Sequence, residues 1–300
     1  MSTQFPTRLG WLLIILVTFL LLQNACTPIQ PPSQAQSPLS AGSGRKVTES
    51  PHLTTIEETS ISPDGEWIAT VTAEIPYMAE EYTQSLIVEH RSGSPRYEVV
   101  KGSFHYGLGY TLITPFAWTD DNSRFYYGNA GHPDGCALFG GATDLYELDL
   151  VTGTTREILV NDNIATALTF ATNQELIAYA VVGNPILIVQ NINSGDYASV
   201  NLEALLGNDQ MGGIVWAPDS NSFAFVIAHE PCNGGWAVST SLYVLDIGTM
   251  SVTSHLEKDE RLLIPVAWST PEQLLLENNQ GESFLLGLVE NTLTPLTTPQ

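Results

Sequence analysis

One pattern occurs five times in this chain: an apolar run ending on a large side chain, a short polar turn, and a second apolar run. Its clearest copy is Ile214–Ile227, in which Trp216 is followed by Ala-Pro-Asp-Ser-Asn-Ser and then by Phe-Ala-Phe-Val-Ile. Two strand-forming runs on either side of a turn rich in Pro, Asp and Asn are typical of an antiparallel hairpin. The other four copies are centred on Ile61, Trp118, Phe170 and Trp268.

The five anchor positions recur with a regular period. They are separated by 57, 52, 46 and 52 residues, and two more strand-like runs follow each hairpin. A period near fifty residues with four strands is typical of a β-propeller blade, in which each repeat buries its faces against its neighbours. We therefore predict an all-β fold, a single β-propeller of four-stranded antiparallel blades, with five blades favoured and six possible. The expected blades are 55–102, 111–162, 164–208, 211–258 and 261–298.

Two short motifs strengthen this prediction. A box of the form Ser-Pro-Asp-Gly, at residues 62–65 and as Ala-Pro-Asp-Ser at 217–220, is followed later in the repeat by Leu-Tyr-x-Leu-Asp at 145–149 and 242–246. Together they resemble the repeats of TolB-like and related WD-type β-propellers over roughly residues 55–297. The match is loose at 119–121 and only positional at 171–173 and 269–271. The resemblance implies the fold and says almost nothing about function.

The N-terminus has the features of an export signal. The apolar run Leu9–Leu22 is shorter than the about 20 residues of a membrane-spanning helix, which suits a signal peptide at residues 1–25. It ends in Ala25-Cys26, similar to a bacterial lipobox, although Gln23 and Asn24 depart from the usual pattern. We expect lipidation at Cys26, with an uncleaved signal anchor and plain secretion as alternatives, and a protein held outside the cytoplasm, in the periplasm or at the cell surface.

Composition separates a stalk from the folded domain. Residues 26–54 carry five prolines among Ser, Gln, Ala and Gly with few large apolar side chains, so we expect a disordered stalk there and the propeller at 55–300. The whole chain has a formal net charge of −22, which opposes binding to nucleic acid. We expect a monomer without a cofactor or a metal ion, whose partners are the membrane, through the lipid, and an unknown protein, peptide or glycan.

Loop lengths indicate where a ligand would bind. The links between second and third strands are long in the first, second and fourth blades, and short in the third and fifth. These links lie on the same face as the connections between blades, so the long loops gather there, where binding sites are usually placed. The candidate ligand-binding residues are polar or aromatic side chains in these loops: Tyr77, Tyr82, His105, Tyr106, Tyr110, His132, His229, Glu230 and Trp236.

Two cysteines remain if Cys26 carries lipid. Cys136 and Cys232 lie in the long loops of the second and fourth blades, and an oxidising compartment permits a disulfide between them. Such a bridge would pass over the third blade, whose short link leaves room. Two unpaired thiols remain an alternative, as does a zinc site formed with His132 and His229, although the ligand spacings do not fit a zinc finger or ribbon.

A catalytic site is not evident. The chain has no Gly-x-Ser-x-Gly motif and no hydrolase domain after the propeller. We read the tryptophans as packing between blades and the turn acids Asp64, Asp120, Asp121 and Asp219 as hydrogen-bonding partners of their own turns. The predicted function is an extracytoplasmic binding or interaction module. The alternative is an enzyme resembling five-bladed glycoside hydrolases, with candidate carboxylates at Glu74, Glu80, Glu81, Asp134 and Glu230.

Overall fold

The computed structural model describes residues 43–78, 80–105, 111–131, 138–142, 144–159, 165–181, 183–231 and 237–296. Strands make up most of these residues, and the helix among them is the single turn α2 (Glu203–Leu206). Every strand pairing is antiparallel. The structure therefore confirms the predicted fold class of four-stranded antiparallel sheets.

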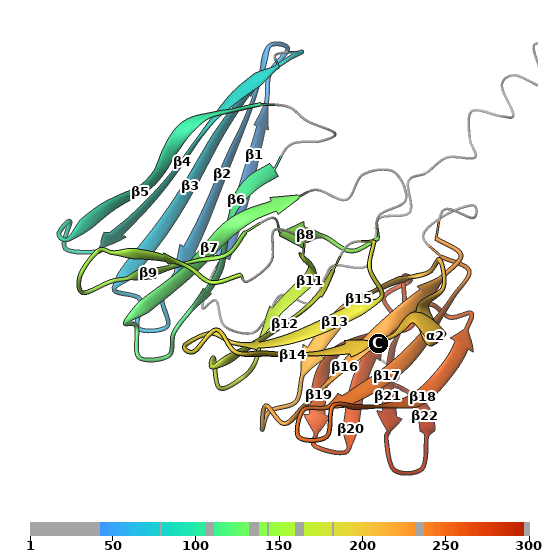
Figure 1. Cartoon of the computed structure of the whole chain (residues 1–300). Coiled ribbons are helices and arrows are strands. Elements are labelled where there is room, and N and C mark those ends of the chain that lie inside the picture. The colour runs from blue at the N-terminus through green and yellow to red at the C-terminus, as the bar shows by residue number, and fades with distance from the viewer. Residues whose placement is uncertain are drawn as a thin grey trace, which may run out of the picture.

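The strands form successive meanders that follow the predicted repeats (Figure 1). The first sheet contains β1 (Ser43–Glu49), β2 (Leu53–Ile61), β3 (Trp67–Pro76), β4 (Glu81–His90) and β5 (Arg96–His105). The second contains β6 (Thr111–Trp118), β7 (Arg124–Gly131), β9 (Tyr146–Asp149) and β10 (Thr155–Glu157). The third contains β11 (Ala165–Phe170), β12 (Leu176–Val181), β13 (Ile186–Asn191) and β14 (Tyr197–Asn201). The fourth contains β15 (Gln210–Trp216), β16 (Ser222–His229), β17 (Ser239–Asp246) and β18 (Ser251–Asp259), and the fifth β19 (Ile264–Thr270), β20 (Gln273–Glu277), β21 (Ser283–Gly287) and β22 (Thr292–Leu296).

The hydrophobic cores lie between neighbouring sheets. One cluster joins Val71 and Leu86 of the first sheet to Trp118 and Phe125 of the second. Corresponding clusters join the second sheet to the third, the third to the fourth, and the fourth to the fifth. Each sheet thus buries its apolar face against the next, which is the packing that the repeat pattern predicted.

The hairpin turns share one backbone geometry. In four of them the fourth turn residue has a positive φ, at Gly65, Asn122, Gln174 and Ser220, and its N–H donates to the carbonyl of the first turn residue. Asx-type side-chain bonds support the turns, as at Asp121, whose Oδ1 accepts the Ser123 N–H at 3.0 Å. Hydrogen bonds from Thr119 and Ser123 lower the pKa of the Asp121 carboxyl to about 2. The turn of the third repeat, Ala171–Gln174, matches the sequence motif only in position. It nevertheless has the same backbone geometry as the other three turns.

Neighbouring turns are also hydrogen-bonded to each other. The Asp64 N–H donates to Asn122 Oδ1 at 3.3 Å, the Asp120 N–H donates to Gln174 Oε1 at 2.9 Å, and the Asn173 N–H donates to Ser220 Oγ at 2.9 Å. These bonds join the first four repeats in chain order. Asp120 Oδ1 accepts from Gln174 Nε2 at 2.9 Å as well, so this side chain connects the second repeat to the third.

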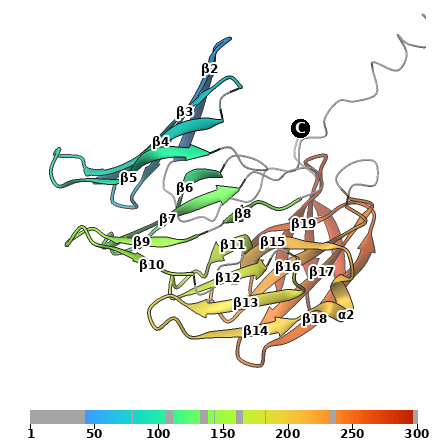
Figure 2. The ribbon, with the colours of Figure 1, turned by 45° about the horizontal axis from the view of Figure 1, so that its top comes forward.

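The sheets follow one another along an arc that the described strands do not close. Figures 1 and 2 place the first and the fifth sheets at opposite ends of the arrangement. Strand β1 pairs with β2 along its whole length and not with β22, so this segment extends the first sheet instead of completing the last. Residues 43–49, expected to belong to the disordered stalk, therefore form a strand, because backbone pairing with the edge of β2 needs no apolar side chains.

The long link of the second repeat contributes a strand of its own. Gly141 and Ala142 form β8, which pairs with β7 on one side and with β11 on the other. This short strand joins the second and third sheets into one continuous hydrogen-bonded sheet. The link was expected to be a loop only, but two of its residues pair with strands on both sides.

Candidate functional site

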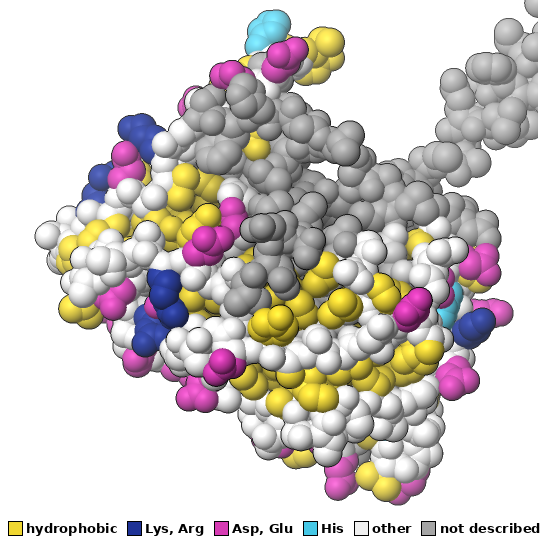
Figure 3. Space-filling view, viewed as in Figure 1, with side chains coloured by type: hydrophobic (Ala, Val, Ile, Leu, Met, Phe, Trp, Pro, Cys, Tyr) yellow, Lys and Arg dark blue, Asp and Glu magenta, His cyan; other side chains and the backbone are white. Residues whose placement is uncertain are grey.

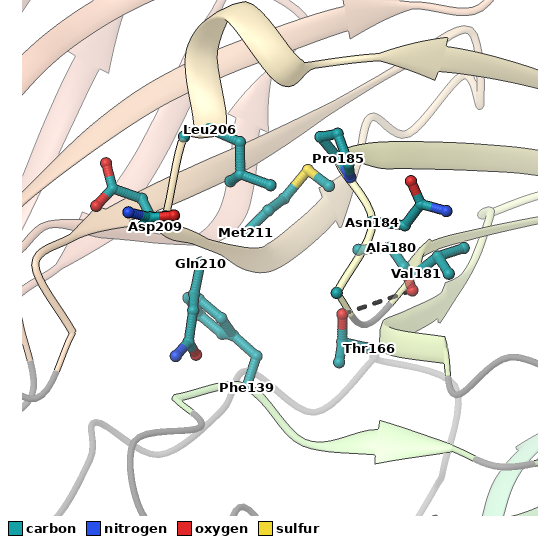
Figure 4. Close-up of a pocket in the computed structure, with 13 residues that line it drawn as sticks. Phe139, Thr166, Ala180, Val181, Asn184, Pro185, Leu206, Asp209, Gln210 and Met211 are labelled. Atoms are coloured by element: carbon teal, nitrogen blue, oxygen red, sulfur yellow. Dashed lines mark hydrogen bonds between the residues drawn. The ribbon is translucent and has the colours of Figure 1, made fainter.

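A cavity of about 520 Å³ lies between the third and fourth sheets. Three segments surround it: the end of β12 with its link to β13, the segment from α2 into β15, and Phe139 just before β8 (Figure 4). The apolar lining residues are Phe139, Ala180, Val181, Pro185, Leu206 and Met211, and the polar ones are Thr166, Asn184, Asn208, Asp209 and Gln210. A volume of this size is within the range of small-ligand sites.

The position of the cavity follows from the loop lengths. The link from β12 to β13 is short, and the connection from the third sheet to the fourth makes the single turn α2 before it enters β15. The Leu202 N–H donates to the Pro185 carbonyl at 2.7 Å, which holds this connection against the link. As predicted, a link between second and third strands and a connection between repeats meet on the same face.

Phe139 reaches the cavity from the long link of the second repeat. The Leu138 N–H donates to Gln210 Oε1 at 2.8 Å, and the Phe139 ring lies directly over Gly212 of β15. A Cβ atom at Gly212 would overlap that ring, so only glycine allows this approach. The link therefore crosses the third repeat and contacts the fourth.

The polar end of the cavity is a hydrogen-bonded row of three side chains. Asp209 Oδ2 lies 2.5 Å from His229 Nδ1, and His229 Nε2 lies 2.7 Å from Ser241 Oγ. Asp209 Oδ1 also accepts the Glu230 N–H at 3.0 Å. The row holds the cavity wall at Asp209 against the β16–β17 hairpin.

The order aspartate, histidine, serine also occurs in hydrolytic triads, but the serine here is not placed for nucleophilic attack. Ser241 is only 2% exposed within β17, and its Oγ accepts the Lys258 N–H at 2.9 Å. A nucleophile has to be within reach of the substrate atom that it attacks. We therefore assign the row a positioning role.

Two of the predicted ligand-binding residues lie beside this cavity without lining it. His229 and Glu230 contact Asp209, whereas Tyr77 is 73% exposed at the β3–β4 turn of the first sheet. The prediction for Tyr82 is wrong: this side chain is 1% exposed and packs with Ile56, Ile75 and Leu112, because it lies on the inward face of β4. The backbone of His105 ends β5. Tyr106, Tyr110, His132 and Trp236 lie outside the described residues, as do Cys26, Cys136 and Cys232.

The sequence analysis missed the residues that form the cavity itself, above all Phe139, Asp209 and Met211. Phe139 and Asp209 lie just before strands, where periodicity gives no signal, and Met211 lies within β15, where the pattern indicates a core residue. One signal was present: the pair Gly212-Gly213 interrupts an otherwise apolar strand, and such glycines mark a close approach by another part of the chain.

The carboxylates considered for glycoside hydrolysis do not form one site. Glu74, Glu80 and Glu81 belong to the β3–β4 hairpin of the first sheet, whereas Glu230 follows β16 of the fourth, and the two sheets lie apart in both views. Asp134 lies outside the described residues. Within the described part of the chain, no group of three or more His, Cys, Asp or Glu side chains is arranged to hold a metal ion.

Comparisons with known proteins add little to this geometry. No family model matches the sequence, and no curated protein is similar to it. Among solved structures, TolB from Acinetobacter baumannii is 13% identical with a TM-score of 0.39, covering 90% of this chain and 65% of that protein. Dipeptidyl peptidase 4 from Porphyromonas gingivalis is 11% identical with a TM-score of 0.48, covering 91% of this chain and 42% of the peptidase. A Lactobacillus plantarum protein is 11% identical, also with a TM-score of 0.48, over 86% of this chain and 82% of its own. Values this low establish neither a family nor an activity.

Proposed function

We propose that this protein is an exported, lipid-anchored binding module and that the cavity between the third and fourth sheets is its ligand site. The observation that carries the proposal is the construction of the cavity. Apolar residues from separate segments form most of its walls, and Asp209 lies at one end of the lining, where His229 and the Glu230 N–H hold its carboxylate in place. Apolar walls with a few fixed polar groups are characteristic of small-ligand sites.

The size of the cavity suits a small molecule or a single large side chain of a peptide. We expect 2-phenylethanol, a neutral aromatic probe, to bind with a stoichiometry of one and an affinity in the millimolar range, about −4 kcal/mol. Ligand-detected NMR titration of the whole chain measures this binding. The absence of any saturable binding by 2-phenylethanol and by charged analogues of the same size would refute the proposed site.

The substitution Gly212→Ala tests whether such binding occurs in this cavity. The new methyl group would displace the Phe139 ring, and we expect the affinity for 2-phenylethanol to fall about tenfold, or 1.4 kcal/mol. Gly44→Ala is the matched control, since a Cβ at Gly44 meets nothing within 4 Å. Equal affinity in both variants and the unaltered protein would place the probe elsewhere. Thermal unfolding of each variant reports whether the fold is retained.

The lipid anchor and the disulfide belong to the same proposal. No helix of the described residues has the length and apolar character needed to cross a bilayer. A pairing of Cys136 with Cys232 is supported by contacts between described residues near each cysteine. The Leu138 N–H, two residues after Cys136, donates to Gln210 Oε1. Gln210 in turn pairs with Ala228 across β15 and β16, four residues before Cys232.

Intact-mass analysis of the membrane-extracted protein tests both modifications. We expect a chain that begins at an acylated Cys26 and weighs two hydrogen atoms less than its reduced form. Under denaturing conditions it should show no free thiol until a reductant is added. The variant Cys26→Ser should leave the membrane fraction. Two alkylatable thiols before reduction would exclude the disulfide.

A further inference from the structure

We infer that the cavity selects an amphipathic organic cation, with its ammonium group at Asp209 and its apolar body against Phe139, Leu206 and Met211. This inference rests on the proposed function, because it names the class of ligand that the same cavity accepts. It depends on the charge state of the Asp209–His229–Ser241 row and on the composition of the cavity walls.

A neutral imidazole satisfies every hydrogen bond of the row. The Lys258 N–H donates to Ser241 Oγ, so the Ser241 hydroxyl is free to donate to His229 Nε2. The remaining imidazole proton then lies on Nδ1 and is donated to Asp209 Oδ2. We assign this tautomer from the network, in which every donor has an acceptor. His229 therefore positions the Asp209 carboxylate without cancelling its negative charge.

The Asp209 carboxylate keeps capacity for a ligand. Each of its oxygens accepts one described hydrogen bond, from His229 Nδ1 and from the Glu230 N–H, whereas an ionised carboxylate can accept about four. The side chain is 23% exposed and lines the cavity. Its remaining lone pairs can therefore accept hydrogen bonds from a ligand.

Charge complementarity indicates that the ligand is positively charged. Among the described residues that line the cavity none is Lys or Arg, and the chain as a whole carries a formal net charge of −22. In Figure 3 the Lys and Arg side chains lie on the left part of the face and at its right rim. An anionic ligand would place its charge near Asp209 without compensation, whereas an ammonium ion would form a charge-assisted hydrogen bond there.

The apolar lining of the cavity favours an organic cation over a metal ion. A metal ion prefers several oxygen ligands, and the cavity lining contains a single carboxylate. Most of the wall opposite Asp209 is apolar: Figure 4 shows Val181 and Pro185 across the space from Leu206, with Met211 between them and Phe139 below. Desolvating an aromatic or aliphatic body on these surfaces adds affinity that an inorganic ion cannot gain.

Three aromatic probes of similar size and different charge test the inference. We expect phenethylamine to bind about tenfold or more tighter than 2-phenylethanol at neutral pH, and 3-phenylpropionate to bind more weakly than either. Asp209→Asn should abolish the advantage of the amine while retaining the affinity for the alcohol, and that retained affinity shows that the cavity is intact. Titration calorimetry and ligand-detected NMR measure these constants.

A matched variant separates local from overall charge. Asp219→Asn removes the same charge from the turn between β15 and β16, where Asp219 bonds only the Asn221 N–H among its described contacts, and should leave all three affinities unchanged. An equal loss of amine binding in the two variants would overturn the inference, since it would reflect net charge alone. Equal binding of amine and alcohol would also overturn it while leaving the cavity as a binding site. Failure of all three probes would instead refute the proposed function.

Discussion

Replacing Trp118 with alanine is expected to lower the free energy of unfolding by about 3–5 kcal/mol. Trp118 has 0% exposure, and its ring lies 4.3 Å from that of Phe125 between centroids, at the boundary of the first and second sheets. Its Nε1 donates to Ser60 Oγ of the first sheet at 2.8 Å, so the substitution also leaves a buried hydroxyl without this donor. Chemical denaturation monitored by circular dichroism measures the loss.

Trp268→Ala is the matched control for this prediction. Trp268 is the corresponding anchor of the fifth repeat, is only partly buried, and donates from Nε1 to the Val215 carbonyl at 3.0 Å. Less apolar surface is buried there, so the cost should be smaller than at Trp118. The contact between the first and second sheets would not have the importance that we assign to it in either of two cases. The two substitutions could lower the free energy of unfolding equally, or Trp118→Ala could lower it by less than about 1 kcal/mol.

Removing the carboxylate of Glu147 should be the second large effect, with a loss of about 2–4 kcal/mol of unfolding free energy for Glu147→Ala. Glu147 is 7% exposed; its Oε2 accepts from Tyr126 Oη at 3.0 Å and lies 2.9 Å from Arg156 Nη2. Arg156 and Arg124 also reach Ile192 and Asn193 beyond β13, so this cluster joins the second sheet to the third. The arginines are partly exposed and retain solvation, which limits the cost.

The Tyr126 hydroxyl provides a second measurement of the same cluster. Burial, and then the Glu147 charge, raises the pKa of Tyr126 to about 12. Absorbance titration of Glu147→Ala should show a lower pKa for this tyrosine, still above the usual value of 10 because the burial remains. The exposed acid Glu157 of β10 serves as the control, and Glu157→Ala should change neither the stability nor the pKa of Tyr126. An unchanged Tyr126 pKa in Glu147→Ala would contradict the proposed coupling.

The repeats were predictable because local sequence decides them. A turn such as Ala217–Ser220 needs particular residues at particular φ values, and the flanking runs are apolar and rich in strand-forming residues. Both properties are visible within a few residues. The role of Trp118 and Trp216 as buried anchors follows from the same pattern, since a large apolar residue before a polar turn has only the neighbouring sheet to pack against.

The binding residues were not predictable in the same way. Tyr82 was selected as a loop aromatic, but β4 begins at Glu81, and the alternation of faces along this strand places Tyr82 on the buried side with Gln84 and Leu86. Phe139 and Asp209 come from segments 70 residues apart that meet only when the second, third and fourth repeats have packed. Nothing in either local segment indicates that contact.

The amino-acid sequence by itself determined the all-β class, the hairpin turns, the approximate limits of the repeats and the face on which the connecting segments gather. These depend on short-range preferences for strand and turn and on the alternation of apolar residues. Only the tertiary structure decided that β1 extends the first sheet, that β8 joins two sheets, and that Phe139 lies over Gly212 beside Asp209. Those contacts depend on the distances between packed sheets, and such distances result from the sum of many side-chain volumes that no single segment contains.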